Sequence, residues 1–125
     1  MKYFLVGLGG AIGSITRYGV VSLFPRLVGG GFPWGTFSVN LMGSFAIGFI
    51  ARFFYLDFPQ HQLVWLFVVV GFLGGFTTFS AFSFDSLILL QKQSYILFFG
   101  NVCLHIFGCL LAVIVGHSLS KLIIS

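Results

Sequence analysis

Four long apolar stretches, separated by short connections, account for most of the chain. They cover residues 3–24, 34–55, 63–90 and 95–122. A helix needs about 20 residues to cross the hydrocarbon core of a bilayer, so each stretch is long enough to span a membrane. The connections are rich in Gly, Pro, Gln and Ser, which are typical of turns. The pattern predicts an all-α integral membrane protein, with residues 1–125 as a single domain of four transmembrane helices.

The third stretch is interrupted near its centre by glycines and hydroxyl side chains. Residues 71–83 read GFLGGFTTFSAFS, with three glycines among the first five. Gly weakens a helix, and the backbone groups it releases cannot face lipid, so they must face protein, water or an ion. We therefore expect a broken helix that restarts near Thr77 or Thr78. The N-terminus of the restarted helix carries a partial positive charge, which suits an anion. The carbonyls freed over residues 74–77 suit a hard cation such as Na⁺.

Composition narrows the class of protein. The chain is 58% hydrophobic and only 6% charged, with a mean hydropathy of +1.11, which excludes an ordinary soluble domain. The net charge of +4 is not gathered into a basic cluster, so we expect no nucleic-acid partner. The three histidines lack the spacing of metal ligands, and no residue is assigned a catalytic role.

The basic residues divide evenly between the two sides of a four-span chain. One side carries Lys2, Arg52 and Lys121, and the other carries Arg26, Lys92 and, near the end of the first span, Arg17. Lys and Arg in short loops normally set the orientation of a membrane protein. Balanced charges allow insertion in both orientations, and so allow an antiparallel homodimer of opposed subunits.

Polar side chains inside the spans are costly in lipid and mark function or helix contacts. Thr36, Asn40 and Ser44 follow one another at four-residue spacing, so they lie on one face of the second helix. This stripe either forms hydrogen bonds between helices or lines a pore. Asn40 is the stronger pore candidate because its amide offers two donors and one acceptor.

Two aromatic residues follow the predicted break. Phe79 and Phe82 are three residues apart and face one way, with Ser80 and Ser83 on an adjoining track. The edge of a phenyl ring is positive, so it can meet a small anion without a fixed charge that would trap it.

Arg17 and His105 have two readings each. Gly9 and Gly13 share a face of the first span with Arg17, and the glycines indicate close helix packing. Arg17 either pairs with Asp85 or draws anions into a vestibule. His105 either forms a hydrogen bond with a neighbour or borders a polar pathway.

Taken together, these segments resemble the Fluc (CrcB) family of fluoride ion channels. The matching segments are residues 9–18 (GGAIGSITRY), 35–36 (GT), 40–45 (NLMGSF), 71–83 (GFLGGFTTFSAFS) and, more weakly, 101–102 (NV). The resemblance covers essentially the whole chain. The run GGFTTFSAFS is its most specific part.

The resemblance implies an antiparallel homodimer with two fluoride pores and a structural Na⁺ at the dimer interface. Backbone carbonyls of Gly74 and Thr77 would hold the Na⁺, and Arg17 would lie toward the vestibule. The expected fluoride-pore residues are Phe79, Phe82, Asn40, Ser80, Ser83, Thr36 and His105. Family members usually carry hydroxyl side chains near the positions of His105 and Cys109, so this chain departs from the pattern there.

The function implied is passive export of cytoplasmic fluoride across the cell membrane, which would reduce fluoride toxicity. One alternative is a small proton-coupled exporter of drug-like cations, which needs a carboxylate inside the membrane. Asp85 is the sole candidate for that role, because Asp57 lies in a predicted loop. A non-conducting assembly protein is the third alternative.

Overall fold

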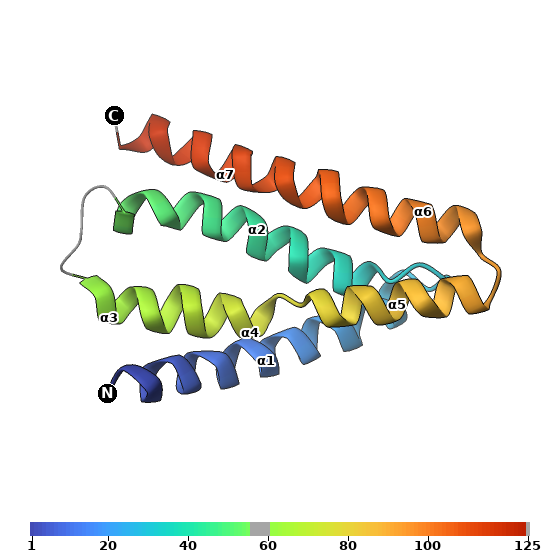
Figure 1. Cartoon of the computed structure of the whole chain (residues 1–125), viewed down its shortest axis with the longest axis horizontal. Coiled ribbons are helices and arrows are strands. Elements are labelled where there is room, and N and C mark those ends of the chain that lie inside the picture. Colours follow the sequence, from blue (N-terminus) through green and yellow to red (C-terminus); the bar gives the residue numbers. More distant parts are fainter. Residues whose placement is uncertain (56–60, 125) are drawn as a thin grey trace.

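The computed structural model describes residues 1–55 and 61–124, and over these residues it contains helices and no strands. Four of its helical spans are long and apolar enough to cross a membrane: Lys2–Leu27, Trp34–Phe54, Gln62–Gln91 and Tyr95–Ile123. The spans run alternately up and down, so both termini lie at the same end of the bundle (Figure 1). The predicted multi-pass, all-α membrane architecture is confirmed.

The first two spans are continuous helices, α1 (Lys2–Leu27) and α2 (Trp34–Tyr55). Helix α1 continues three residues beyond the approximate end expected at residue 24, and Pro25 lies inside its last turn. The Val28 N–H donates to the Phe24 carbonyl and closes this turn. In the predicted connection after α2, residues 56–60, including Asp57, lie outside the described residues.

The third and fourth spans are divided into shorter elements. The third consists of α3 (Gln62–Trp65), a π-helical segment (Leu66–Leu73), α4 (Gly74–Phe76) and, after a break, α5 (Phe79–Gln91). The fourth consists of α6 (Tyr95–Cys103), a π-helical segment (Leu104–Gly108) and α7 (Cys109–Ile123). The π-helical turns, which often occur at functional sites, were not expected from the sequence.

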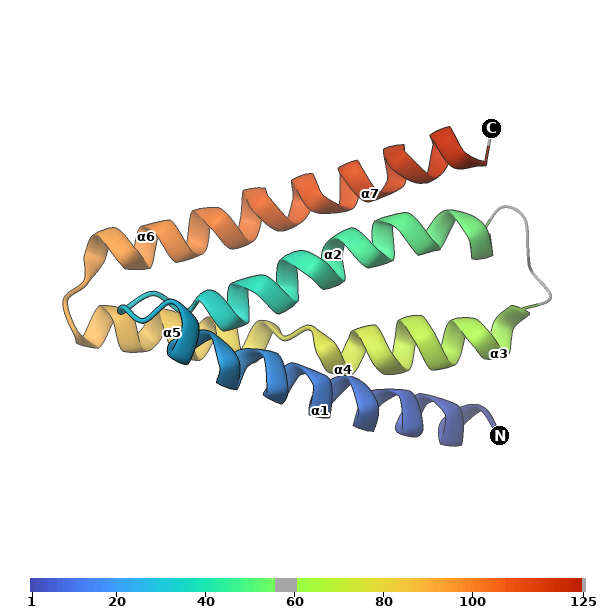
Figure 2. The same ribbon diagram turned by 180° about the vertical axis from the view of Figure 1, so that it is seen from behind.

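Helix α1 packs along the first half of the third span, and α2 packs along α7 (Figures 1 and 2). Glycines make the first contact possible. A Cβ atom at Gly9 would overlap the carbonyl oxygen of Phe67, and one at Gly13 would overlap that of Phe72. From the other side, a Cβ atom at Gly75 would overlap the Gly10 carbonyl. The packing role predicted for Gly9 and Gly13 is therefore confirmed.

The contact between α2 and α7 is equally close. A Cβ atom at Gly48 would overlap the Val113 carbonyl, and one at Gly116 would overlap the Phe45 carbonyl. In lipid there is little hydrophobic drive to bring helices together, so such small-residue contacts supply van der Waals packing instead. Each of the two helix pairs is thus held by its own set of glycines.

We expect Gly13→Ala to destabilise the protein by about 1–3 kcal/mol, because the added Cβ forces two backbones apart. Gly19→Ala, also on α1, is the matched control, since a Cβ there meets open space. The measurement is the fraction of protein that stays monodisperse after heating in detergent, followed by size-exclusion chromatography. Equal heat resistance of the two variants would contradict this account of the packing.

Candidate functional site

The break in the third span lies where the glycine and threonine run predicted it. Helix α4 ends at Phe76, Thr77 and Thr78 are extended, and α5 begins at Phe79. The Thr78 hydroxyl caps α5 by accepting a hydrogen bond from the Ala81 N–H at 3.1 Å. The expected restart near Thr77 or Thr78 is confirmed, and the positive end of α5 lies at the middle of the span.

The Asn40 side chain of α2 binds the backbone of the break. Its Nδ2 donates to the Thr78 carbonyl at 2.9 Å, and its Oδ1 accepts from the Thr78 N–H at 2.8 Å. Both residues are buried. The two bonds satisfy backbone groups that a continuous helix would have paired internally. One amide hydrogen of Asn40 remains for another acceptor.

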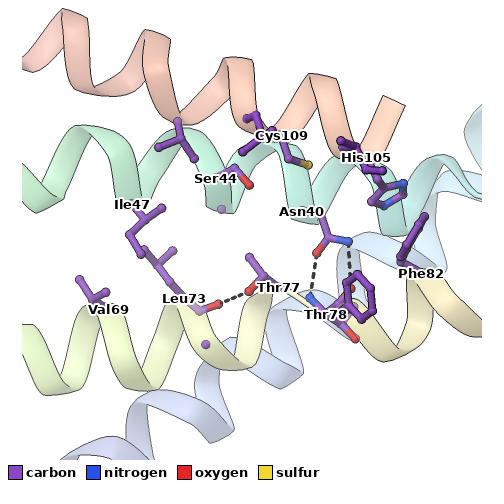
Figure 3. A pocket seen from close by; sticks show the side chains of 16 residues that line it. Asn40, Ser44, Ile47, Val69, Leu73, Thr77, Thr78, Phe82, His105 and Cys109 are labelled. Atoms are coloured by element: carbon purple, nitrogen blue, oxygen red, sulfur yellow. Dashed lines mark hydrogen bonds between the residues drawn. The ribbon is translucent and has the colours of Figure 1, made fainter. Parts of the chain in front are cut away.

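A groove of about 560 Å³ opens beside this contact (Figure 3). Its walls come from α2, both halves of the third span and the fourth span, with Asn40, Ser44, Thr77, Phe82 and His105 among the lining side chains. No Asp, Glu, Lys or Arg of the described residues lines it. The groove therefore combines hydrogen-bonding groups with an absence of fixed charge, His105 aside.

Phe79 and Phe82 both line the groove, with ring centroids 5.3 Å apart and planes tilted by 56°. Their surroundings differ. Phe82 is only 9% exposed, whereas Phe79 is 77% exposed. Phe82 is thus held in place by the surrounding helices, and Phe79 projects from them.

His105 lies in the π-helical turn of the fourth span and faces the ring of Phe82, 4.3 Å away between centroids (Figure 3). Its Nδ1 lies 3.0 Å from the backbone carbonyl of Asn101. Its Nε2 is buried and has no hydrogen-bond partner among the described residues. Both readings of the sequence are met, because the ring is hydrogen-bonded to a neighbour and also lines the groove.

Three of the expected pore residues lie away from the groove. Ser80 and Ser83 are exposed on α5, where the Ser80 hydroxyl contacts that of Thr78 and the Ser83 hydroxyl donates to the Phe79 carbonyl. Thr36 lines a second cavity of about 210 Å³, near the connection between α1 and α2. Of the predicted pore set, the structure brings together Asn40, Phe79, Phe82 and His105.

One of the two readings of Arg17, an ion pair with Asp85, is not met among the described residues. Asp85 accepts a hydrogen bond from the Thr36 hydroxyl at 2.7 Å, and Arg17 Nη1 donates to the Thr77 carbonyl at 3.5 Å. Arg17 precedes the end of α1 by ten residues, about 15 Å of helix. It therefore lies level with the break, deeper than expected, and the short Thr36–Asp85 bond provides the carboxylate with a neutral partner.

Sequence reasoning missed a chain of hydrogen bonds that joins α5 to the fourth span. The buried Asn101 Nδ2 donates to the Ser86 hydroxyl at 3.0 Å, and Ser86 donates to the Phe82 carbonyl at 2.8 Å. The four-residue spacings of Phe82 to Ser86 and of Asn101 to His105 could have indicated it. The pairing between the two helices could not be read from either spacing.

The fold and the groove define a class: a small multi-pass membrane protein whose broken third helix borders an uncharged, hydrogen-bonding groove. The family model described as CrcB-like protein, Camphor Resistance (CrcB), matches residues 4–117. The chain belongs to this family, as its resemblance to the Fluc (CrcB) channels predicted.

Three relatives that match most of the chain are each named fluoride-specific ion channel FluC. The protein from Elusimicrobium minutum is 41% identical over 98% of this chain and 96% of its own. The relative from Thermus thermophilus is 46% identical over 87% of this chain and 83% of its own. The one from Rhizobium etli is 49% identical over 74% of each.

Replacing Asn40 by the similarly sized Leu should leave the Thr78 N–H and carbonyl unpaired inside the bundle. We expect a loss of roughly 1–3 kcal/mol for each of these two groups. Heating in detergent followed by size-exclusion chromatography measures the loss. Met42→Leu, on an exposed part of α2, is the control and should match the wild type. If Asn40→Leu were as heat-resistant as Met42→Leu, the hydrogen bonds would not be what holds the break.

Proposed function

We propose that this protein is a fluoride-selective channel through which cytoplasmic fluoride leaves passively. The observation that carries the proposal is that Asn40, Phe82 and the start of α5 all border a groove that no Asp, Glu, Lys or Arg of the described residues lines. The relatives are named as fluoride-specific channels, which supports fluoride as the conducted ion.

The chemistry of the groove suits a small anion that moves. The spare amide hydrogen of Asn40 and the edges of Phe79 and Phe82 can contact fluoride with partial positive charges. The start of α5 adds the positive end of a helix. Conduction needs binding strong enough to replace water and weak enough to release the ion. Groups of partial charge meet both needs better than a fixed cation would.

We propose that the functional unit is a homodimer. The groove is open, one amide hydrogen of Asn40 in its wall has no partner among the described residues, and Phe79 beside it is 77% exposed. A second copy would close the groove and bury that ring. Ser80 and Ser83, exposed on the same helix, would then have a partner surface as well.

An antiparallel arrangement agrees with the placement of the basic residues. Lys2, Arg52 and Lys121 lie at the end of the bundle that carries both termini, while Arg26 and Lys92 lie at the other. Arg17, which lies level with the break, does not add to either side. Three residues against two give little bias in orientation, so both orientations could insert into the cell membrane.

The backbone of the break fits the Na⁺ expected from the resemblance. In a continuous α-helix the Gly74 carbonyl would accept from the Thr78 N–H, but here that N–H donates to the Asn40 side chain. Among the described residues, the Thr77 carbonyl accepts one hydrogen bond, a long one from Arg17. Carbonyl oxygens are ligands suited to hard cations. Gly74 and Thr77 of each copy would hold the ion, whose charge would tie the two breaks together.

The direction of flow follows from the physiology of a passive anion channel. A negative membrane potential drives fluoride out of the cytoplasm without any coupled ion, and its loss would reduce fluoride toxicity. A proton-coupled exporter is not favoured, because Asp85 does not line the groove and its carboxylate is bound by Thr36.

Fluoride and chloride efflux from liposomes tests the proposal. Liposomes loaded with both anions and reconstituted with the protein should lose fluoride and retain chloride once a K⁺ ionophore clamps the potential. Retention of both anions would refute a channel, and equal loss of both would refute selectivity.

Phe82→Ile should reduce fluoride efflux by about tenfold or more, the effect of roughly 1.4 kcal/mol on a rate. The change keeps an apolar side chain and removes the ring edge. Phe84→Ile is the matched control, because Phe84 lies on the same helix but outside the groove and is 63% exposed. Unchanged efflux through Phe82→Ile would count against contact between fluoride and the ring.

Replacement of Na⁺ by N-methylglucamine throughout purification should lower the fraction of dimer measured by chemical crosslinking. The expected reason is repulsion between opposed carbonyls once the cation is gone. Re-addition of Na⁺ should restore the dimer. A dimer fraction that stays constant after exhaustive exchange would contradict a structural Na⁺.

A further inference from the structure

His105 is the one titratable side chain in the wall of the groove besides the thiol of Cys109. It is only 8% exposed, and its ring lies between Phe82 of α5 and Phe37 of α2, with centroids 4.3 and 5.4 Å away. A buried imidazole normally has partners for both nitrogens. In this structure Nε2 has none among the described residues, which calls for a physical explanation.

The hydrogen bond at Nδ1 determines the tautomer. Nδ1 lies 3.0 Å from the Asn101 carbonyl, which can only accept, so Nδ1 must carry the proton. In the neutral ring Nε2 then carries a lone pair and can only accept a hydrogen bond. Neutral His105 therefore cannot donate a hydrogen bond to fluoride, although the position faces the groove.

A second set of hydrogen bonds holds Asn101, whose carbonyl determines the tautomer of His105. Ser86 has one hydroxyl proton and donates it to the Phe82 carbonyl, so it must accept from Asn101 Nδ2. This orients the Asn101 amide and leaves its Oδ1, like Nε2, a buried acceptor without a donor. The fourth span thus presents two unsatisfied acceptors one turn apart, and a proton on Nε2 would convert one of them into a donor.

We propose that His105 Nε2 is a proton-binding site linked to fluoride: a proton binds there when fluoride occupies the groove beside Phe82. This inference rests on the proposed function. A lone pair repels the anion, whereas a protonated ring in the groove wall adds an attractive charge. Because fluoride favours the protonated ring, binding of fluoride takes up protons, and affinity for fluoride rises as pH falls.

The elements packed around the ring carry few charged or titratable groups among the described residues. The acid on α5, which packs against α6, is Asp85, and its carboxylate accepts a hydrogen bond from the Thr36 hydroxyl. From α2 the neighbour is Phe37, which does not titrate. On the same span Cys109 lines the groove one turn away and is neutral as a thiol. The positive end of α5 opposes the charged ring, so a bound anion is needed to favour it.

Proton uptake on addition of fluoride provides the test. Purified wild-type protein in weakly buffered detergent solution near pH 7 should make the solution more alkaline when NaF is added, by up to one proton per fluoride bound. NaCl should have no such effect. Between pH 6 and pH 8, the fluoride dissociation constant should rise by up to tenfold per pH unit, the limit for one linked proton.

His105→Gln should abolish the uptake, whereas His117→Gln, on the same span but outside the groove, should retain it. Uptake that persists in His105→Gln would overturn the proposal. So would wild-type protein that conducts fluoride with no uptake and no pH dependence, a result that leaves the proposed channel intact. Liposomes that retain fluoride at every pH would refute the channel itself, and the linked proton with it.

Discussion

The two hydrogen bonds between the Asn40 amide and the backbone of Thr78 are the interaction on which the rest of the site depends. A chain that breaks a helix at mid-membrane exposes donors and acceptors to a medium that cannot satisfy them. The Asn40 amide pairs with both the N–H and the carbonyl of Thr78. The break can then place the start of α5 and the ring of Phe82 beside the groove without leaving the Thr78 backbone unpaired.

Close backbone contacts determine where the groove lies. Gly13 allows α1 to rest against the third span, and Gly116 allows α7 to rest against α2. Since each pair is tightly packed, the space that remains lies between the pairs, bordered by α2, the break and the fourth span. The same small residues that supply packing in lipid thus also shape the groove.

The electrostatics of the site rest on partial charges. Asp85 is bound by Thr36 away from the groove, and Arg17 donates to a backbone carbonyl at the break. The groove wall is mainly aliphatic and aromatic, and its polar groups are the Asn40 amide, hydroxyls, the Cys109 thiol and the imidazole of His105. An anion would meet attraction without a permanent counter-ion, and the imidazole is the one group there whose charge the proposed linkage would change.

The sequence by itself determined the four spans, the position of the break and the glycine faces, because hydrophobic length, helix propensity and four-residue spacing are local properties. It also marked Asn40, Phe82 and His105 as polar or aromatic exceptions within apolar stretches. Only the tertiary structure decided that Arg17 pairs with Thr77 and not Asp85, that Ser83 faces away from the groove, and that Asn101 fixes the tautomer of His105. Those outcomes depend on the rotation and depth of one helix relative to another. Contacts between residues distant in the sequence set both quantities, and the spacing of residues along a single helix does not encode them.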